Sequence, residues 1–211
     1  MVEKQIYLTY PADNMGGIQK MIKRCFDVVL SLIGLIILSP VFLVFYLILK
    51  IQGNGGAIFK QERIGYNGNP FTIYKFRTLS PENEANGPRL MPTFDEEETS
   101  GFCGFLRDSH LDELPQLWNV FIGDMSIVGP RPERQYYIDL IMKEDPSYLL
   151  IYQMKPGLTS EATLYNGYTD TMEKMLKRLR MDVNYLRSRT LVLDCQIIVN
   201  TLVAMISGRK F

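Results

Sequence analysis

The sequence is poor in the residues on which many catalytic and metal sites depend. It has one histidine, His110, and three cysteines, Cys25, Cys103 and Cys195, which lie far apart. No CxxC pair or Cys/His spacing indicates zinc, and three separated cysteines give no disulfide framework. A Ser-His triad would depend on His110, and no GxSxG stretch accompanies it. Any chemistry must therefore rest mainly on carboxylates and arginines, with or without a metal.

A net charge is also absent. The chain has 211 residues, and its 23 basic residues balance its 23 acidic ones. With an isoelectric point near 6.6 and no basic low-complexity tract, the composition argues against a nucleic-acid partner. The length allows one domain with a real core, with or without a membrane element.

Charge is missing altogether from residues 28–49, which are rich in Leu, Ile, Val and Phe. At ~1.5 Å per residue, a straight helix of this length could cross the ~30 Å hydrocarbon core of a bilayer. Ser39 and Pro40 interrupt the run, and an interior proline kinks a helix. Basic residues flank both ends: Lys20, Lys23 and Arg24 precede the run, and Lys50, Lys60 and Arg63 follow it. These flanks favour a re-entrant helix with both ends in the cytoplasm, and an ordinary kinked span is the alternative.

The remaining patterns suggest an α/β fold in a single membrane-associated domain. We expect a leader over residues 1–19, the re-entrant membrane helix over 20–51 and a catalytic domain on the cytoplasmic face over 52–211. A short β-hairpin is predicted around Asn67-Gly68, and the polar segment 80–100 could close over a site as a lid. Two C-terminal helices are expected. One is basic and amphipathic from Met172, and one is apolar over 191–206. Both suit a membrane interface or a core.

Two adjacent acids, Asp112 and Glu113, stand where an apolar helical pattern begins. Its apolar positions predict one buried face, formed by Leu114, Leu117, Trp118 and Phe121. Pro115 is tolerated only in the first turn, so the helix should begin close to the acids. The acids could be helix caps or a reactive centre, and Arg107, five residues upstream, could hold a phosphate beside them.

Further basic residues could face an anion. Gly129 and the rigid Pro130-Arg131-Pro132 unit suggest a tight turn whose amides and guanidinium bind phosphate, although such turns also occur in ordinary connections. The predicted hairpin carries Arg63 in QERIG, and Lys75 and Arg77 alternate with Tyr74 and Phe76 in YKFRT. They could neutralise a nucleotide diphosphate or be solvated residues of a strand edge, and the spacing favours neither.

These motifs, in this order, resemble the bacterial sugar transferase family of monotopic phosphoglycosyltransferases. The resemblance runs from about Lys20 to the C-terminus through KRCFDVVLSLIGLIILSP, FKQERIG, YKFRT, LRDSHLDELPQLWNVFIGDMSIVGPRP and KPGLT. The short length resembles the minimal form of the family, which lacks the additional four-helix membrane bundle of larger members.

The resemblance implies an enzyme on the cytoplasmic face of the bacterial inner membrane. It would transfer a sugar 1-phosphate from a UDP-sugar to polyprenyl (undecaprenyl) phosphate and release UMP, which begins capsule, exopolysaccharide, O-antigen or glycoprotein glycan assembly. Asp112 would be the nucleophile that forms an aspartyl phosphosugar intermediate. Mg²⁺ bound by Asp112 and Glu113, with Arg107 and Arg131 on the phosphates, would neutralise charge, and Glu113 would be a metal ligand or a proton acceptor. The re-entrant helix, bent at Ser39-Pro40, is also a family feature.

One segment departs from the family pattern. Many members carry a Gly-Trp-Ala-Gln-Val-type stretch after the PGLT-like motif, and here Ser160, Glu161 and Tyr168 lie in or near those positions. The donor sugar is therefore open, as is the oligomeric state, including a homodimer. Two rival functions remain: a non-catalytic membrane-tethered assembly protein, and a glycosyltransferase that releases UDP. The absence of a DxD pair counts against the second.

Overall fold

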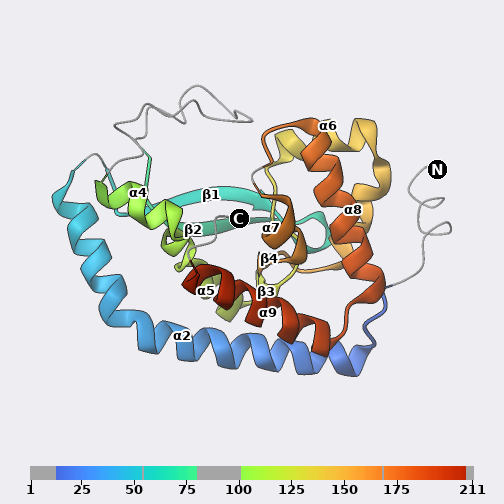
Figure 1. The fold of residues 1–211 in the computed structure, drawn as a ribbon, viewed down its shortest axis with the longest axis horizontal. Coiled ribbons are helices and arrows are strands. Elements are labelled where there is room, and N and C mark those ends of the chain that lie inside the picture. The colour runs from blue at the N-terminus through green and yellow to red at the C-terminus, as the bar shows by residue number, and fades with distance from the viewer. Residues whose placement is uncertain (1–12, 54, 80–100, 168, 208–211) are drawn as a thin grey trace.

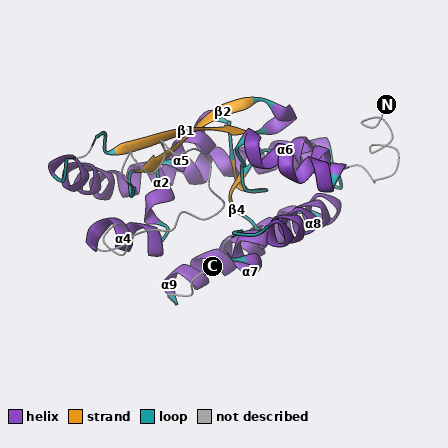
Figure 2. Cartoon of the chain, turned by 90° about the horizontal axis from the view of Figure 1, so that it is seen from above, coloured by secondary structure: helices purple, strands orange, loops and turns teal. Residues whose placement is uncertain are grey.

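Helices make up most of the chain in the computed structural model, which describes residues 13–53, 55–79, 101–167 and 169–207 (Figure 1). The predicted lid over 80–100 and most of the predicted leader lie outside these ranges. The strands form two separate two-stranded sheets, so the expected α/β fold is a mostly helical single domain. Figure 2 shows α7, α8 and α9 (Glu161–Asn166, Met172–Ser188 and Leu191–Ile206) along one side of the molecule, with β1 (Ile58–Ile64) and β2 (Pro70–Phe76) on the other.

The predicted membrane helix is α2, Gly17–Ile51, which begins three residues earlier than expected and contains Pro40. It is the one described helix long and apolar enough to cross a membrane. Pro40 removes one backbone hydrogen bond, and the Ser39 hydroxyl donates to the Ile36 carbonyl at 2.8 Å. In Figure 1, α2 runs along the base of the molecule and then turns upward. Its outward side chains are exposed and apolar, among them Met21, Phe26, Ile33, Ile36, Ile37, Leu43 and Leu47.

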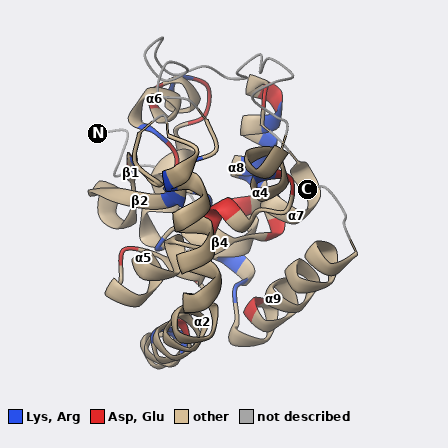
Figure 3. Cartoon of the chain, turned by 90° about the vertical axis from the view of Figure 1, so that its left-hand side faces the viewer, with Lys and Arg blue, Asp and Glu red and all other residues tan. Residues whose placement is uncertain are grey.

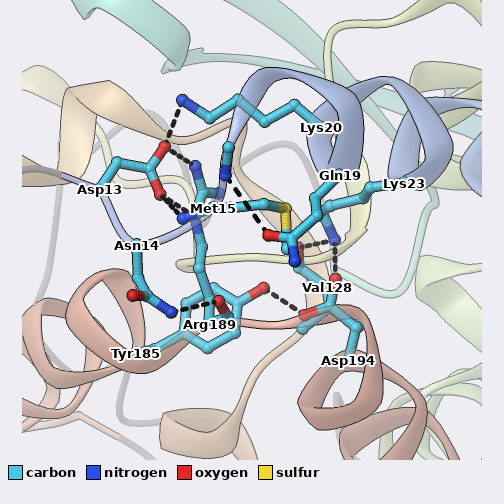
Figure 4. Close-up of polar contacts among 11 residues, drawn as sticks. Asp13, Asn14, Met15, Gln19, Lys20, Lys23, Val128, Tyr185, Arg189 and Asp194 are labelled. Atoms are coloured by element: carbon cyan, nitrogen blue, oxygen red, sulfur yellow. Dashed lines mark hydrogen bonds and ion pairs between the residues drawn. The ribbon is translucent and has the colours of Figure 1, made fainter.

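Polar contacts fasten the start of α2 to the domain (Figure 4). The Lys23 ammonium donates to the Val128 carbonyl at 3.0 Å and to Asp194 at 2.6 Å. Asp194 also accepts from the Tyr185 hydroxyl at 2.5 Å. Ahead of the helix, Asp13 pairs with Arg189. This end of α2 is therefore held against the ends of β3 (Ser126–Val128), α8 and α9.

Apolar and aromatic contacts fasten the other end of α2. Leu49 is fully buried with Phe76 and Leu106. The rings of Phe42 and Phe45 meet Phe76 edge-on, with centroids 5.8 and 5.6 Å apart. Both ends of α2 therefore contact one and the same domain.

The predicted hairpin is confirmed. β1 (Ile58–Ile64) and β2 (Pro70–Phe76) pair antiparallel, and a 3₁₀ turn over Tyr66–Gly68 connects them. Asn67 and Gly68 have φ angles of 57° and 73°, in the left-handed region that these two residue types tolerate best. Ile73 on β2 is buried against Val120 and Met125.

A second, parallel strand pair was not expected. β3 (Ser126–Val128) pairs with β4 (Gly157–Thr159), which joins the GDMSIVGPRP and KPGLT motifs. Three-residue strands are too short to show an alternating pattern. A side chain at Gly129 would place a Cβ only 2.3 Å from the Lys155 carbonyl oxygen, so the crossing of the two segments requires glycine.

The remaining helices are α4 (Gly101–Asp108), α5 (Gln116–Ile122) and α6 (Gln135–Glu144), with a 3₁₀ segment over Pro146–Gln153. The apolar stripe of α8 is buried in the main core through Met175, Leu179, Val183 and Leu186. Of the two environments predicted for this helix, a membrane interface or a core, the core is therefore correct. Arg178, one of the basic residues of this amphipathic helix, is buried as well. α9 buries Ile197 and Ala204 but exposes Val192, Val199, Leu202, Val203 and Ile206.

Candidate active site

The two acids lie in a tight turn between α4 and α5. His110 adopts a left-handed φ of 57° and starts a 3₁₀ turn over Leu111–Glu113, and Pro115 directly precedes α5. The helix therefore begins where the proline predicted. The predicted buried face is wrong in part, because Leu117 is buried whereas Trp118 is 47% exposed. α5 has apolar residues on its outward side as well as on its core side, and periodicity alone cannot tell these sides apart.

Glu113 is held by two cations. Its Oε1 atom lies 2.6 Å from the Lys75 ammonium and 3.1 Å from an Arg131 guanidinium nitrogen. Burial alone would raise the pKa of Glu113, but the positive charges of Arg131 and Lys75 hold this pKa well below its usual range. Glu113 is therefore an ionised, fixed carboxylate that binds side chains, rather than a cap on the amides of α5.

The pKa of Asp112 is shifted in the opposite direction. Asp112 is only 8% exposed. Burial raises its pKa to about 6, an effect that Lys75 opposes and the negative charge of Glu113 increases. No hydrogen bond joins its carboxylate to another described residue. Two neighbouring acids with pKa values pushed apart are typical of carboxylates with different catalytic roles, and the more basic one is the better nucleophile.

Lys75 reaches the acids because of strand geometry. Side chains two residues apart share one face of a strand, so Lys75 lies on the same face of β2 as Ile73, which packs against α5. The Lys75 ammonium therefore reaches the turn that precedes α5.

Arg107, in the last turn of α4, donates to the Thr78 carbonyl at 3.0 Å, and its charge lowers the pKa of Asp112. Three of the predicted basic residues, Lys75, Arg107 and Arg131, thus act electrostatically on the acids. Figure 3 shows Lys, Arg, Asp and Glu mainly above α9, whose ribbon is mostly uncharged.

The Pro130-Arg131-Pro132 unit is a rigid elbow between β3 and α6. Both prolines are buried, and the Pro130 carbonyl accepts from the Gly157 amide at 2.9 Å. The prolines therefore contribute shape, and Arg131 supplies the charge.

Arg63 and Arg77 donate to backbone carbonyls. Arg63 donates to the Pro132 carbonyl at 3.3 Å, behind the elbow. Arg77, 8% exposed, donates to the Leu49 carbonyl at 2.9 Å at the end of α2. These contacts favour the interpretation that both arginines position the chain, and their predicted binding of a diphosphate stays a prediction.

Asn119 is a site residue that sequence reasoning missed. It is fully buried, donates to the Thr72 carbonyl at 2.7 Å, and accepts from the Tyr74 amide at 3.2 Å. It thereby joins β2, which carries Lys75, to α5, which follows the acids. The only signal in the sequence was an amide within an apolar helical run.

The predicted magnesium site has few protein ligands. No group of three or more His, Cys, Asp or Glu side chains that could hold a metal occurs among the described residues. Mg²⁺ is commonly bound by one or two carboxylates together with substrate phosphates, so the donor set of Asp112 and Glu113 fits it. Lys75 and Arg131 both contact Oε1 of Glu113, which leaves Oε2 and the Asp112 carboxylate as the candidate ligands.

Comparisons with known proteins show similarity along most of the chain. A family model described as bacterial sugar transferase matches residues 18–208. A UDP-glucose:undecaprenyl-phosphate glucose-1-phosphate transferase of Klebsiella pneumoniae is 36% identical over 189 residues, which cover 89% of this chain and 40% of the relative. A protein of Caulobacter vibrioides with the same description is 35% identical over 188 residues, 88% of this chain and 70% of the relative.

A third relative carries a different sugar in its name. The UDP-N-acetylgalactosamine-undecaprenyl-phosphate N-acetylgalactosaminephosphotransferase of Aeromonas hydrophila is 31% identical over 187 residues, 89% of this chain and 44% of the relative. The chain thus spans about two fifths of the length of the Klebsiella and Aeromonas relatives.

Proposed function

The chain belongs to the bacterial sugar transferase family, and we propose that it transfers a sugar 1-phosphate from a UDP-sugar to undecaprenyl or another polyprenyl phosphate. The observation that carries this proposal is the buried pair of acids, in which Asp112 has a raised pKa and Glu113 is fixed by Lys75 and Arg131. The names of the relatives support the reaction class and leave the donor open, since they include glucose and N-acetylgalactosamine.

Two displacements at one phosphorus describe the reaction. The Asp112 carboxylate attacks the sugar-bearing phosphorus, the bond to the bridging oxygen breaks, and UMP leaves with the electron pair. An oxygen of polyprenyl phosphate then attacks the same phosphorus, and the acyl phosphate bond breaks to restore the Asp112 carboxylate and yield the polyprenyl diphosphosugar.

Charge neutralisation makes these displacements feasible. A carboxylate approaches a diphosphate against repulsion, and Arg131, Lys75 and Arg107 lie where they oppose it. Mg²⁺ held by Glu113 and Asp112 would supply further positive charge on the phosphates. The lowered pKa makes Glu113 a poor proton acceptor, which favours the ligand role over the base role.

We expect UMP to be released from at least one UDP-sugar when Mg²⁺ and polyprenyl phosphate are present. A panel of UDP-hexoses and UDP-N-acetylhexosamines, with nucleotides separated by chromatography, tests this and names the donor. Release of UDP would instead indicate a glycosyltransferase. No nucleotide release from any donor would favour an assembly protein.

The re-entrant arrangement of α2 is part of the proposal. A straight helix of 35 residues would be about 52 Å long, far more than a bilayer core needs. Both ends of α2 contact the same domain, and its outward face is apolar. A domain on one side of the membrane can hold both ends only if the helix enters and leaves through the same face, which we place at the cytoplasmic side of the inner membrane.

Single cysteines test this topology. With the native cysteines replaced by serine, Gly16→Cys and Gln52→Cys, both at exposed positions, should react with an impermeant maleimide only from the cytoplasmic side. Ile36→Cys, on the outward apolar face, should be protected by lipid and serves as the control. Labelling of the two end positions from opposite sides of the membrane would refute the re-entrant arrangement.

A further inference from the structure

Glu133, two residues after Arg131, forms ion pairs with two arginines from different parts of the chain. Its Oε1 atom lies 2.6 Å from the Arg178 guanidinium of α8, and its Oε2 atom lies 3.7 Å from that of Arg63 of β1. The side chains of all three residues are at most 16% exposed. Such a buried ion pair contributes little net stability compared with apolar packing, so its value lies in the geometry it imposes.

The backbone of the same segment is fixed as well. The Ile64 amide donates to the Glu133 carbonyl at 3.0 Å, and Arg63 donates to the Pro132 carbonyl at 3.3 Å. On the other side of Arg131, the Pro130 carbonyl accepts from Gly157 of β4 at 2.9 Å. Arg131 is therefore anchored on both sides, by β4 before it and by β1 and α8 after it.

Arg131 needs such anchoring because its side chain is long and 35% exposed. It crosses from the elbow to Glu113, and it also lines a small cavity together with Glu133, Arg178 and Asp182. Charges that are already in place when a reaction begins stabilise a transition state more effectively than charges that must be ordered first.

We propose that Glu133 and Arg178 are positioning residues that hold Arg131 against Glu113 through the ion pair between the elbow and α8. The inference rests on the proposed function, because Arg131 is assigned there to the phosphate charge. Arg63, predicted from the sequence to bind phosphate, belongs to the same set of contacts.

A double-mutant cycle on UMP release tests this inference. We expect Arg131→Met to lower kcat roughly 100-fold and Arg178→Met roughly 10-fold, both with little change in KM for the donor. Since Arg178 is proposed to act through Arg131, the double variant should be no slower than Arg131→Met alone. Arg178→Lys, which keeps the charge, should restore part of the loss.

Arg180→Met is the matched control, because Arg180 lies on the exposed face of the same helix. It should retain wild-type kcat, and thermal unfolding should show that each variant is folded. If Arg178→Met does not fold, Arg178→Lys takes its place in the cycle. Multiplying losses in the double variant would overturn the positioning role while leaving the proposed function intact. A wild-type protein that releases no UMP from any donor would overturn both.

Discussion

Replacing Asp112 by asparagine is expected to lower kcat for UMP release by about 10³-fold or more, and to abolish any covalent sugar phosphate on the protein. The amide has nearly the shape of the carboxylate but lacks the charge and the nucleophilic oxygen. No hydrogen bond to another described residue depends on the Asp112 carboxylate, and burial already penalises its ionised form. Asp112→Asn should therefore fold normally, and UMP release with the active donor measures the effect.

Asp139→Asn provides the control for this variant. Asp139 is exposed on α6, and its carboxylate accepts a hydrogen bond from Gln135 of the same helix at 2.7 Å. Because this contact does not involve the two acids, the same chemical change there should leave kcat unchanged. UMP release by Asp112→Asn within tenfold of wild type would mean that the nucleophile is another group.

Replacing Glu113 by glutamine is expected to lower kcat about 100-fold or more, and to move the pH dependence of the reaction. The neutral amide gives Lys75 and Arg131 no counter-charge and offers a weaker donor for Mg²⁺. In the wild type, activity should fall as the pH drops through about 6, because Asp112 becomes protonated there. The charge of Glu113 helps to raise this pKa, so in Glu113→Gln the fall should occur at lower pH.

Lys75→Met should shift the pH profile the other way. Lys75 lowers the pKa of Asp112, so its removal lets the carboxylate become protonated at higher pH. The rate at saturating donor, measured from pH 5 to pH 9, compares the three proteins. Acid limbs that coincide in all three would contradict the assignment of this limb to Asp112.

The elements that the sequence predicted well are those encoded locally. The hairpin follows from the Asn67-Gly68 turn, and Pro115 marks the start of α5 close to the acids. Asp112 and Glu113 are adjacent in the chain, so their closeness required no knowledge of the fold. The apolar run with Pro40 likewise forms one long helix, as its composition and length indicated.

Features that depend on distant segments could not be predicted. Arg63, Lys75 and Arg77 are all basic residues in or next to the hairpin strands, yet of the three only Lys75 contacts Glu113 directly, since the packing of β2 on α5 decides which residues face the acids. The parallel pairing of β3 with β4 and the role of Asn119 depend on contacts between segments far apart in the chain. Arg178 appeared as one of several basic residues on a helix, and its burial shows only in the fold.

Intact-protein mass spectrometry after mixing with the active UDP-sugar, in the absence of polyprenyl phosphate, tests the central claim most directly. The account predicts that wild-type protein gains the mass of one sugar phosphate and that fragmentation places it on Asp112. The adduct should disappear when polyprenyl phosphate is added, and it should not form on Asp112→Asn. UMP release that strictly requires polyprenyl phosphate, without any adduct on the protein, would show a direct transfer between the two substrates and would contradict the aspartyl intermediate.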